Sequence, residues 1–156
     1  MHHERKVRDR LNSMGIENYL PIIKEVRQWS DRRKEIETML IPMIVFVRVS
    51  SSQRNQLLNI PAVYRYLVLR GEKTPAIIPD HEMDSFRFMI DYSETPVNMQ
   101  ERLLKPGEFV RVIKGPLKGL QGDLITVGDK SRIAVRIAQL GYASVELNAS
   151  FVEKIE

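Results

Sequence analysis

A run near the C-terminal end constrains the fold most, because it sets strand-like alternation against closely spaced turn residues. The run extends from Lys105 to Leu124 and contains four glycines and two prolines. Within it, Val110 and Val112 lie on either side of Arg111, which is the two-residue period of a half-buried strand. Glycines and a proline then interrupt the pattern before apolar residues resume. The run therefore predicts a strand, a glycine-rich turn and a second strand.

The residues after this run continue as short strands. Ile133, Val135 and Ile137 alternate with small or charged residues. Several short strands at regular spacing are typical of a small barrel, so residues 105–156 are predicted to form one.

The run from Lys105 to Leu124 resembles the KOW motif of NusG-like transcription factors and of some ribosomal proteins. Its glycines, valines and basic residues fall in the register of that motif. The resemblance implies an SH3-like barrel. The alternative is an ordinary hairpin in some other small barrel, since turn glycines recur in many folds.

Composition restricts the class of protein further. The chain has 156 residues, of which 43% are hydrophobic, enough for one globular domain or two small ones. It contains no cysteine, which excludes disulfides and thiolate zinc sites. No apolar run approaches the roughly 20 residues of a membrane helix, and no secretory signal is visible. We therefore expect a cytoplasmic protein without a membrane partner, and the net charge of +4 permits a nucleic-acid partner.

The first part of the chain mixes helical and strand patterns. Val7, Leu11 and Met14 have helical spacing, and Gly15 follows as the expected helix stop. The order predicted after this helix is an extended arm over 19–29, a polar hairpin loop over 30–38, a strand over 40–49, a short helix between Ser50 and Pro61, a strand over 64–69 and a helix from Asp80. This order predicts an α+β sandwich.

A polar segment divides the chain. Residues 92–104 have little apolar periodicity and the composition of a linker. The predicted organisation is an α+β domain over 1–91, a linker over 92–104 and the barrel over 105–156.

This order of domains resembles the NusG family over nearly the whole chain. Locally, His3–Val7 is similar to the family's entry into its first helix, 40–49 to its third strand, and Gln28–Lys34 to a loop of its UpxY-type antiterminators of polysaccharide operons. The resemblance implies a ferredoxin-like antiparallel α/β sandwich for residues 1–91. Family members begin with a strand that is missing here, so either this chain is truncated or another segment or chain fills that place.

The resemblance also implies an interface with RNA polymerase. In the family, an apolar depression of the first domain lies on the clamp helices of the polymerase, and the matching residues here are Ile41, Pro42, Ile44 and Phe46. The alternative is a core role. Because strand neighbours point to opposite faces, Phe46 and one residue of each adjacent pair are expected to be buried.

A second group of candidates is mostly basic and is expected to contact nucleic acid or the polymerase gate. The group consists of Arg27, Arg32, Arg33, Lys34, Ser52 and Arg54. Nascent RNA and non-template DNA are the candidate nucleic acids. The alternatives are a solvated hairpin tip for the basic run and helix capping for the serines. Trp29, the single tryptophan, either covers the sheet or stacks on a base.

A third group lies in the predicted barrel and is expected to bind a further partner. Leu140 precedes Gly141 in a loop that, in NusG-like proteins, presents an apolar residue to a small-subunit ribosomal protein or to termination factor Rho. Lys114 and Lys118 are candidate RNA contacts, with solubility as the alternative reason for their charge.

No catalytic pattern is visible, so we expect no enzyme, no cofactor and no metal site. The histidines have no useful spacing to a nucleophile, and no Walker-type phosphate loop is present. The hypothesis is a NusG-type transcription elongation or antitermination factor, whose first domain binds the polymerase clamp and whose KOW domain recruits a partner. The alternative is a KOW-containing RNA-binding or ribosome-associated protein, which explains the barrel but not the preceding α+β part.

Overall fold

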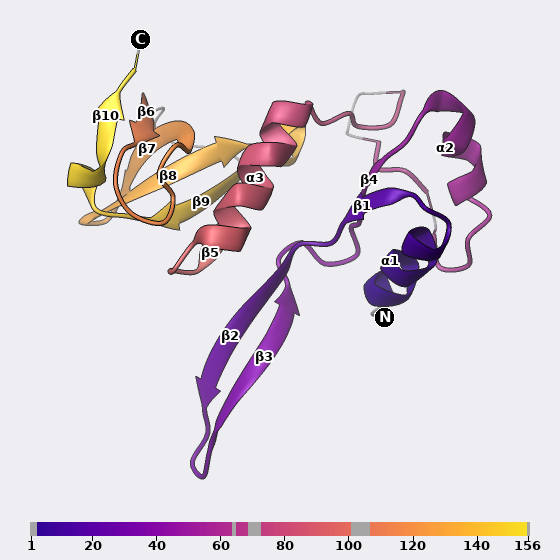
Figure 1. Cartoon of the computed structure of the whole chain (residues 1–156), viewed down its shortest axis with the longest axis horizontal. Helices are drawn as coiled ribbons and strands as arrows, with labels where there is room; N and C mark the ends of the chain where they lie inside the picture. The colour runs from indigo at the N-terminus through magenta and orange to yellow at the C-terminus, as the bar shows by residue number, and fades with distance from the viewer. Residues whose placement is uncertain (1–2, 64, 69–72, 101–106, 156) are drawn as a thin grey trace. The chain divides into compact units, whose positions relative to one another are not determined.

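A computed structural model describes residues 3–63, 65–68, 73–100 and 107–155 of the chain (Figure 1). The side chains of residues 25, 27 and 139 lie outside this description. The chain divides into two compact units, residues 1–67 and 68–156. Each unit has its own buried side chains.

The first unit begins with helix α1, which spans Glu4–Ser13. Gly15 ends the helix, because its φ of 72° lies in the left-handed region that favours glycine. The Gly15 N–H donates to the Asn12 carbonyl at 3.1 Å, and the Ile16 N–H donates to the Leu11 carbonyl at 3.0 Å. These two bonds form a Schellman motif. The helix stop predicted at Gly15 is confirmed.

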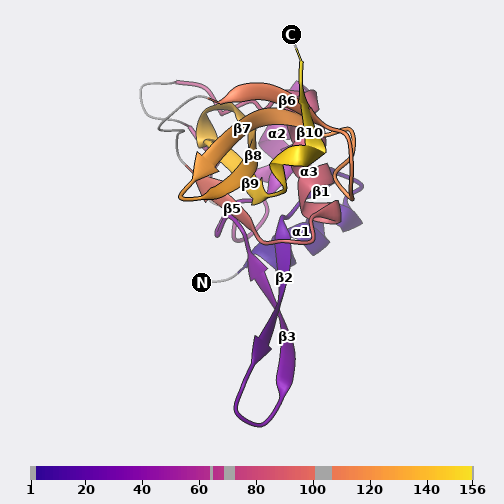
Figure 2. The same ribbon diagram turned by 90° about the vertical axis from the view of Figure 1, so that its left-hand side faces the viewer.

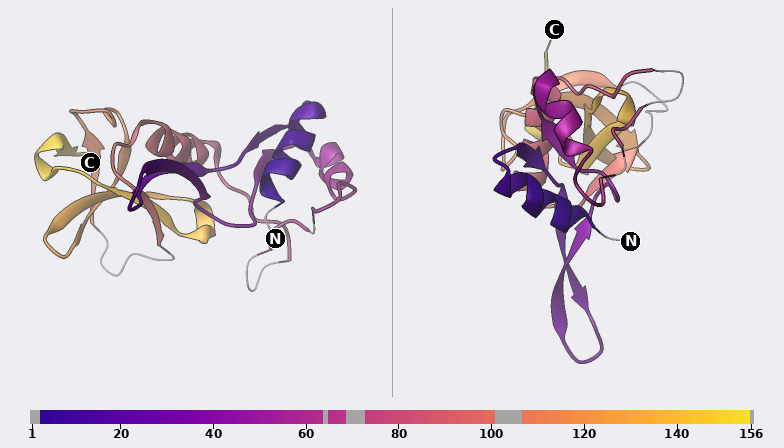
Figure 3. Two further views of the ribbon diagram at one scale, coloured as in Figure 1. Left: turned by 90° about the horizontal axis from the view of Figure 1, so that it is seen from below. Right: turned by 90° about the vertical axis from the view of Figure 1, so that its right-hand side faces the viewer.

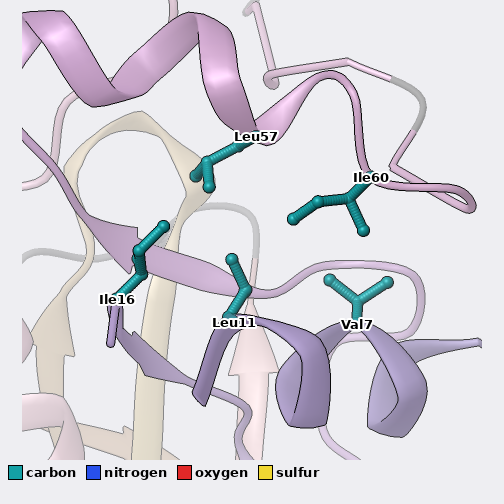
Figure 4. Close-up of a cluster of buried hydrophobic side chains, with 5 residues drawn as sticks. All are labelled: Val7, Leu11, Ile16, Leu57 and Ile60. Atoms are coloured by element: carbon teal, nitrogen blue, oxygen red, sulfur yellow. The ribbon is translucent and has the colours of Figure 1, made fainter. Parts of the chain in front are cut away.

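A small apolar core joins α1 to the second helix of this unit. Helix α2 spans Ser51–Leu57, and its first turn is closed by the Ser50 N–H, which donates to the Gln53 side chain at 3.0 Å. The predicted short helix is thus confirmed. The buried cluster consists of Val7, Leu11, Ile16, Leu57 and Ile60 (Figure 4). Burial of these aliphatic side chains, at about 1.5–3 kcal/mol each when complete, holds the two helices together.

Two antiparallel strand pairs complete the first unit. β1 (Glu17–Tyr19) pairs with β4 (Phe46–Arg48), and β2 (Ile22–Gln28) pairs with β3 (Arg33–Met39). The β2–β3 ladder runs from the Ile22–Met39 pair to the Gln28–Arg33 pair. Figures 1 and 3 show this hairpin extending away from the helices of its unit.

Three predicted bounds in this unit were wrong. The loop predicted over 30–38 is mostly strand β3, whose charged side chains are compatible with a hairpin that is largely exposed. The strand predicted over 40–49 is reduced to β4, because residues 41–43 form a bend and turn at a proline that cannot donate to a ladder. The strand predicted over 64–69 is not formed by the described residues 65–68.

The second unit combines helix α3 (Asp80–Tyr92) with a six-stranded antiparallel sheet. Its strands are β5 (Val97–Gln100), β6 (Glu108–Val112), β7 (Gln121–Val127), β8 (Lys130–Arg136), β9 (Tyr142–Glu146) and β10 (Val152–Lys154). Two short 3-10 helices, η1 (Ala138–Leu140) and η2 (Ala149–Phe151), precede β9 and β10. The strand order is β10-β6-β7-β8-β9-β5, and Figure 2 shows the sheet curving like a barrel.

In the core of the second unit, strand β6 follows the predicted alternation and strand β8 does not. Val110 and Val112 of β6 are buried, whereas Arg111 between them is exposed. In β8, Ile133, Ala134 and Val135 are all buried. Helix α3 packs against β8, which accounts for burial on both faces of that strand.

The segment predicted as a linker contains strand β5. This strand pairs with β9 from Val97–Val145 to Gln100–Tyr142, and both α3 and β5 belong to the second unit. The predicted domain bounds 1–91, 92–104 and 105–156 stay a prediction. Residues 101–106 lie outside the described ranges. The mixed α+β class, with a barrel-like sheet in the C-terminal part, is confirmed. None of the helices in the described ranges has the length and apolar character needed to span a bilayer.

Candidate functional site

The connection between β3 and β4 presents apolar side chains to solvent. We call residues Ile41, Pro42, Met43 and Ile44 the 41–44 loop. Met43 is 80% exposed, and its φ of 66° is one that residues with side chains rarely adopt. Pro42 is also exposed, whereas Ile41 and Ile44 are half-buried. The loop thus places an exposed apolar tip between two partly buried isoleucines.

Glu4 anchors this loop to α1. Its carboxylate accepts a hydrogen bond from the Met43 N–H at 2.9 Å, across 39 positions of sequence. The Glu4 side chain is only 4% exposed and lies in the first turn of α1, where a carboxylate complements the positive end of the helix. A hydrogen bond to a charged group contributes about 1.5–3 kcal/mol, which offsets the strain of the Met43 backbone.

Of the four predicted polymerase-contact residues, one is buried in the core and three are at least partly exposed. Phe46 is 9% exposed in β4, as the core alternative expected. Its neighbours Val45 and Val47 pack against the core cluster. Ile41, Pro42 and Ile44 remain at the surface, and their role stays a prediction. Met43 was not among the predicted contact residues, and its exposure follows from the turn that it forms with Pro42.

A second candidate surface lies at the end of the β2–β3 hairpin. We call residues 29–34 the hairpin tip. Its turn is closed by the Trp29 N–H, which donates to the Arg32 carbonyl at 2.7 Å. The Trp29 side chain is 41% exposed. The Arg32 Cζ lies 5.3 Å from the centroid of the indole and the Lys34 Nζ lies 5.5 Å from it, both within cation–π range.

Charge is distributed unevenly along this hairpin. Away from the tip, Lys24 pairs with Glu35 at 3.9 Å and Glu37 pairs with Arg5 at 3.7 Å. At the tip, no carboxylate among the described side chains forms an ion pair with Arg32, Arg33 or Lys34, and all three are exposed. Arg27 pairs with Lys34 in the backbone register, while its side chain lies outside the description. The predicted basic cluster is therefore brought together at one end of a hairpin.

Ser52 and Arg54 lie on α2, a different element. The Ser52 hydroxyl is 3.0 Å from that of Ser50, and the Arg54 carbonyl accepts from the Tyr66 hydroxyl at 2.8 Å. Burial raises the pKa of Tyr66, and the nearby Arg54 charge opposes this shift. The Arg54 and Ser52 side chains are exposed. The Ser52 hydroxyl thus has a local partner at the start of α2, and contact of Ser52 or Arg54 with the polymerase gate stays a prediction.

The predicted barrel residues fall at two places. Lys114 and Lys118 are exposed at either end of a turn in which the Lys118 N–H donates to the Gly115 carbonyl at 3.1 Å. Leu140 is half-buried in η1, between β8 and β9. The same connection is held by α3, since the Ala138 N–H donates to the Glu82 carboxylate. Any partner contact by these residues stays a prediction.

Comparison with known proteins identifies the family of this chain. A family model described as "Transcription termination factor nusG" matches residues 1–87, more than half of the chain. The chain belongs to the NusG family. It is also 30% identical to the transcription termination/antitermination protein NusG of Pseudomonas aeruginosa over 164 aligned positions, covering 99% of this chain and 91% of that protein. The resemblance to the NusG family inferred from the sequence is thus confirmed, and the similarity to that protein extends through the barrel.

Both the family model and the relative are described as transcription factors that act in termination. Within the described ranges, no group of three or more histidine and carboxylate side chains could hold a metal ion. What the surfaces offer is binding: an anchored apolar loop, a basic hairpin tip with an aromatic ring, and a barrel turn with two exposed lysines.

Proposed function

We propose that this NusG-family chain is a transcription elongation and antitermination factor that binds the clamp of RNA polymerase through its 41–44 loop. The observation that carries the proposal is the exposed apolar tip of that loop, held by the buried Glu4 carboxylate. It lies within the residues that match the family. Exposed apolar patches mark contact sites, and a pre-ordered loop loses less conformational entropy on binding.

The apolar contact would consist of Met43 and Pro42 with the exposed parts of Ile41 and Ile44. Phe46 would act from the core, by fixing the start of β4 at the end of the loop. The action is mechanical: the bound factor bridges the polymerase cleft, holds the clamp closed and suppresses pausing.

The barrel would recruit a further partner, with Lys114, Lys118 and Leu140 as its contact residues. A small-subunit ribosomal protein, termination factor Rho and nascent RNA are the candidates. The connection between the polymerase-binding part and the barrel would tether this partner to the polymerase and raise its effective concentration. The chain would act in the cytoplasm as a specialised paralogue of the UpxY type.

A transcription assay tests this function directly. Purified RNA polymerase transcribes a template that carries a pause site and a terminator, with and without the protein. We expect more full-length transcript in its presence. An unchanged transcript profile, together with co-purification of ribosomal subunits but no polymerase, would favour the ribosome-associated alternative.

A further inference from the structure

The second unit has a cavity between α3 and the outer face of its sheet. The cavity has a volume of about 600 Å³, which is within the range of small-molecule sites, roughly 300–1,000 Å³. Four side chains at the i, i+3, i+4 and i+7 spacing of one helix face form its α3 wall: His81, Asp84, Ser85 and Phe88. All residues that line the cavity belong to the second unit, so one compact unit contains the whole site.

The sheet wall of the cavity is a cross-strand row that α3 covers only in part. Phe109 of β6 pairs with Asp123 of β7, and Asp123 pairs with Ala134 of β8. Residues directly opposite one another project from the same face of a sheet. Ala134, in the strand against which α3 packs, is 1% exposed, Asp123 is half-buried and Phe109 is 48% exposed. The row is therefore closed at β8 and open at β6, where an aromatic ring and a carboxylate are neighbours.

The Asp123 carboxylate has no partner that compensates its burial. It forms no hydrogen bond or ion pair with any of the described side chains. Burial raises the pKa of Asp123, and no nearby cation opposes this shift. A partly desolvated carboxylate without a partner destabilises the folded protein. A cation supplied by a ligand would offset that cost through a charge-assisted hydrogen bond.

The charges around the cavity also favour a single cation. Three carboxylates and two cationic side chains line it, a net charge of −1: Glu82, Asp84 and Asp123 against Lys118 and Arg136. Glu82 accepts from the Ala138 N–H and Arg136 donates to the Ala138 carbonyl, so these two opposite charges lie at one residue and balance. The two aspartates, one on each wall, then outnumber Lys118. One positive charge from a ligand makes the site neutral.

We propose that this cavity binds a small organic cation, namely an ammonium group carried by an apolar body. The ammonium pairs with Asp123 and lies on the Phe109 ring, because an aromatic face attracts a cation and the neighbouring carboxylate adds to that attraction. The apolar body lies between Phe88 and the covered end of the row at Ala134. A neutral or anionic molecule leaves the carboxylate unpaired. The site is in the second unit and does not depend on polymerase binding by the 41–44 loop.

Amide chemical shifts of the isotope-labelled full-length chain measure the binding and locate it. Three probes share a phenyl ring and differ in charge: phenethylammonium, phenethyl alcohol and hydrocinnamate. We expect phenethylammonium to shift the amides of Phe88, Phe109 and Asp123 in a saturable way. The neutral and anionic probes should bind at least about fivefold more weakly, because they lack the ion pair and the cation–π contact. Equal affinity for phenethyl alcohol, or no saturable shift at these amides, would overturn the proposal.

Two variants separate the carboxylate from the ring. Asp123→Asn keeps the shape of the side chain without its charge, and Phe109→Leu keeps an apolar side chain without the aromatic face. Each should bind phenethylammonium about fivefold more weakly. Asp129→Asn is the matched control, because Asp129 is an exposed carboxylate of the turn between β7 and β8, outside the cavity. Wild-type affinity in Asp123→Asn, or an equal loss in Asp129→Asn, would show that Asp123 does not hold the cation and would refute the site.

Discussion

Replacement of Glu4 by alanine would test whether one buried carboxylate holds the 41–44 loop in place. The lost hydrogen bond to the Met43 N–H, 2.9 Å long, is charge-assisted and contributes about 1.5–3 kcal/mol. The lost charge at the start of α1 adds about 0.3–1 kcal/mol. Water can reach part of the exposed loop and satisfy the freed N–H, so the lower half of this range applies. We expect a loss of about 2 kcal/mol in the free energy of unfolding of the first unit.

Urea denaturation followed by circular dichroism measures this loss. With a slope of roughly 2 kcal/mol per molar urea, the midpoint of the first unit should fall by about 1 M. Glu4→Gln keeps a neutral acceptor and should recover part of the loss, because neutral hydrogen bonds are about half as strong. Glu17→Ala is the matched control: it removes an exposed carboxylate 3.9 Å from Arg48 and should cost under about 1 kcal/mol. If Glu4→Ala unfolds at the same urea concentration as Glu17→Ala, the carboxylate does not hold the loop.

Three further predictions concern the second unit and the division of the chain. Gly122→Ala should destabilise the barrel by about 1–3 kcal/mol in urea melts, because the new Cβ would lie 2.5 Å from the Ala134 carbonyl oxygen; unchanged stability would mean that β7 and β8 are free to separate. Burial raises the pKa of Asp123, so the native state favours its protonated form and loses stability as pH rises. Asp123→Asn should accordingly raise the thermal midpoint above that of the wild type near pH 7 and leave it unchanged near pH 3. A variant whose midpoint equals that of the wild type at both pH values would contradict this. Limited proteolysis should cut first between α2 and α3, where the chain passes from one compact unit to the other, and leave two resistant fragments, whereas a first cut within 92–104 would favour the predicted linker.

Local signals predicted those parts of the fold where one residue type decides the backbone. Gly15 ends α1 because only glycine enters the left-handed region without strain, and that requirement is visible in the sequence. Val110 and Val112 predicted β6 because its two faces differ in burial. The burial of Ala134 could not be predicted from its neighbours in the sequence, because it depends on the packing of α3, a distant part of the chain.

Most residues of the candidate sites were predicted, but the strands and long-range contacts that hold them were predicted only in part. Strand β3 begins with three consecutive charged residues on a largely exposed hairpin, so no alternating hydrophobic pattern distinguishes it from a loop. Consequently the basic run around Arg33 was identified and placed in a hairpin loop, while the strand that carries most of that loop was not predicted. Likewise, the anchor between Glu4 and Met43 joins residues 39 positions apart, and no local pattern predicts such a contact.

The central claim is that the 41–44 loop binds RNA polymerase, and affinity measured with purified polymerase tests it most directly. Met43→Asp places a charge on an 80% exposed residue and should not disturb folding, while Ile44→Asp extends the test to a half-buried neighbour. Ile77→Asp is the matched control, because Ile77 is 81% exposed and lies in the other unit. Desolvating a carboxylate in an apolar contact costs several kcal/mol, so we expect binding at least roughly tenfold weaker for Met43→Asp and Ile44→Asp and unchanged for Ile77→Asp. Wild-type affinity in folded Met43→Asp and Ile44→Asp proteins would contradict the claim.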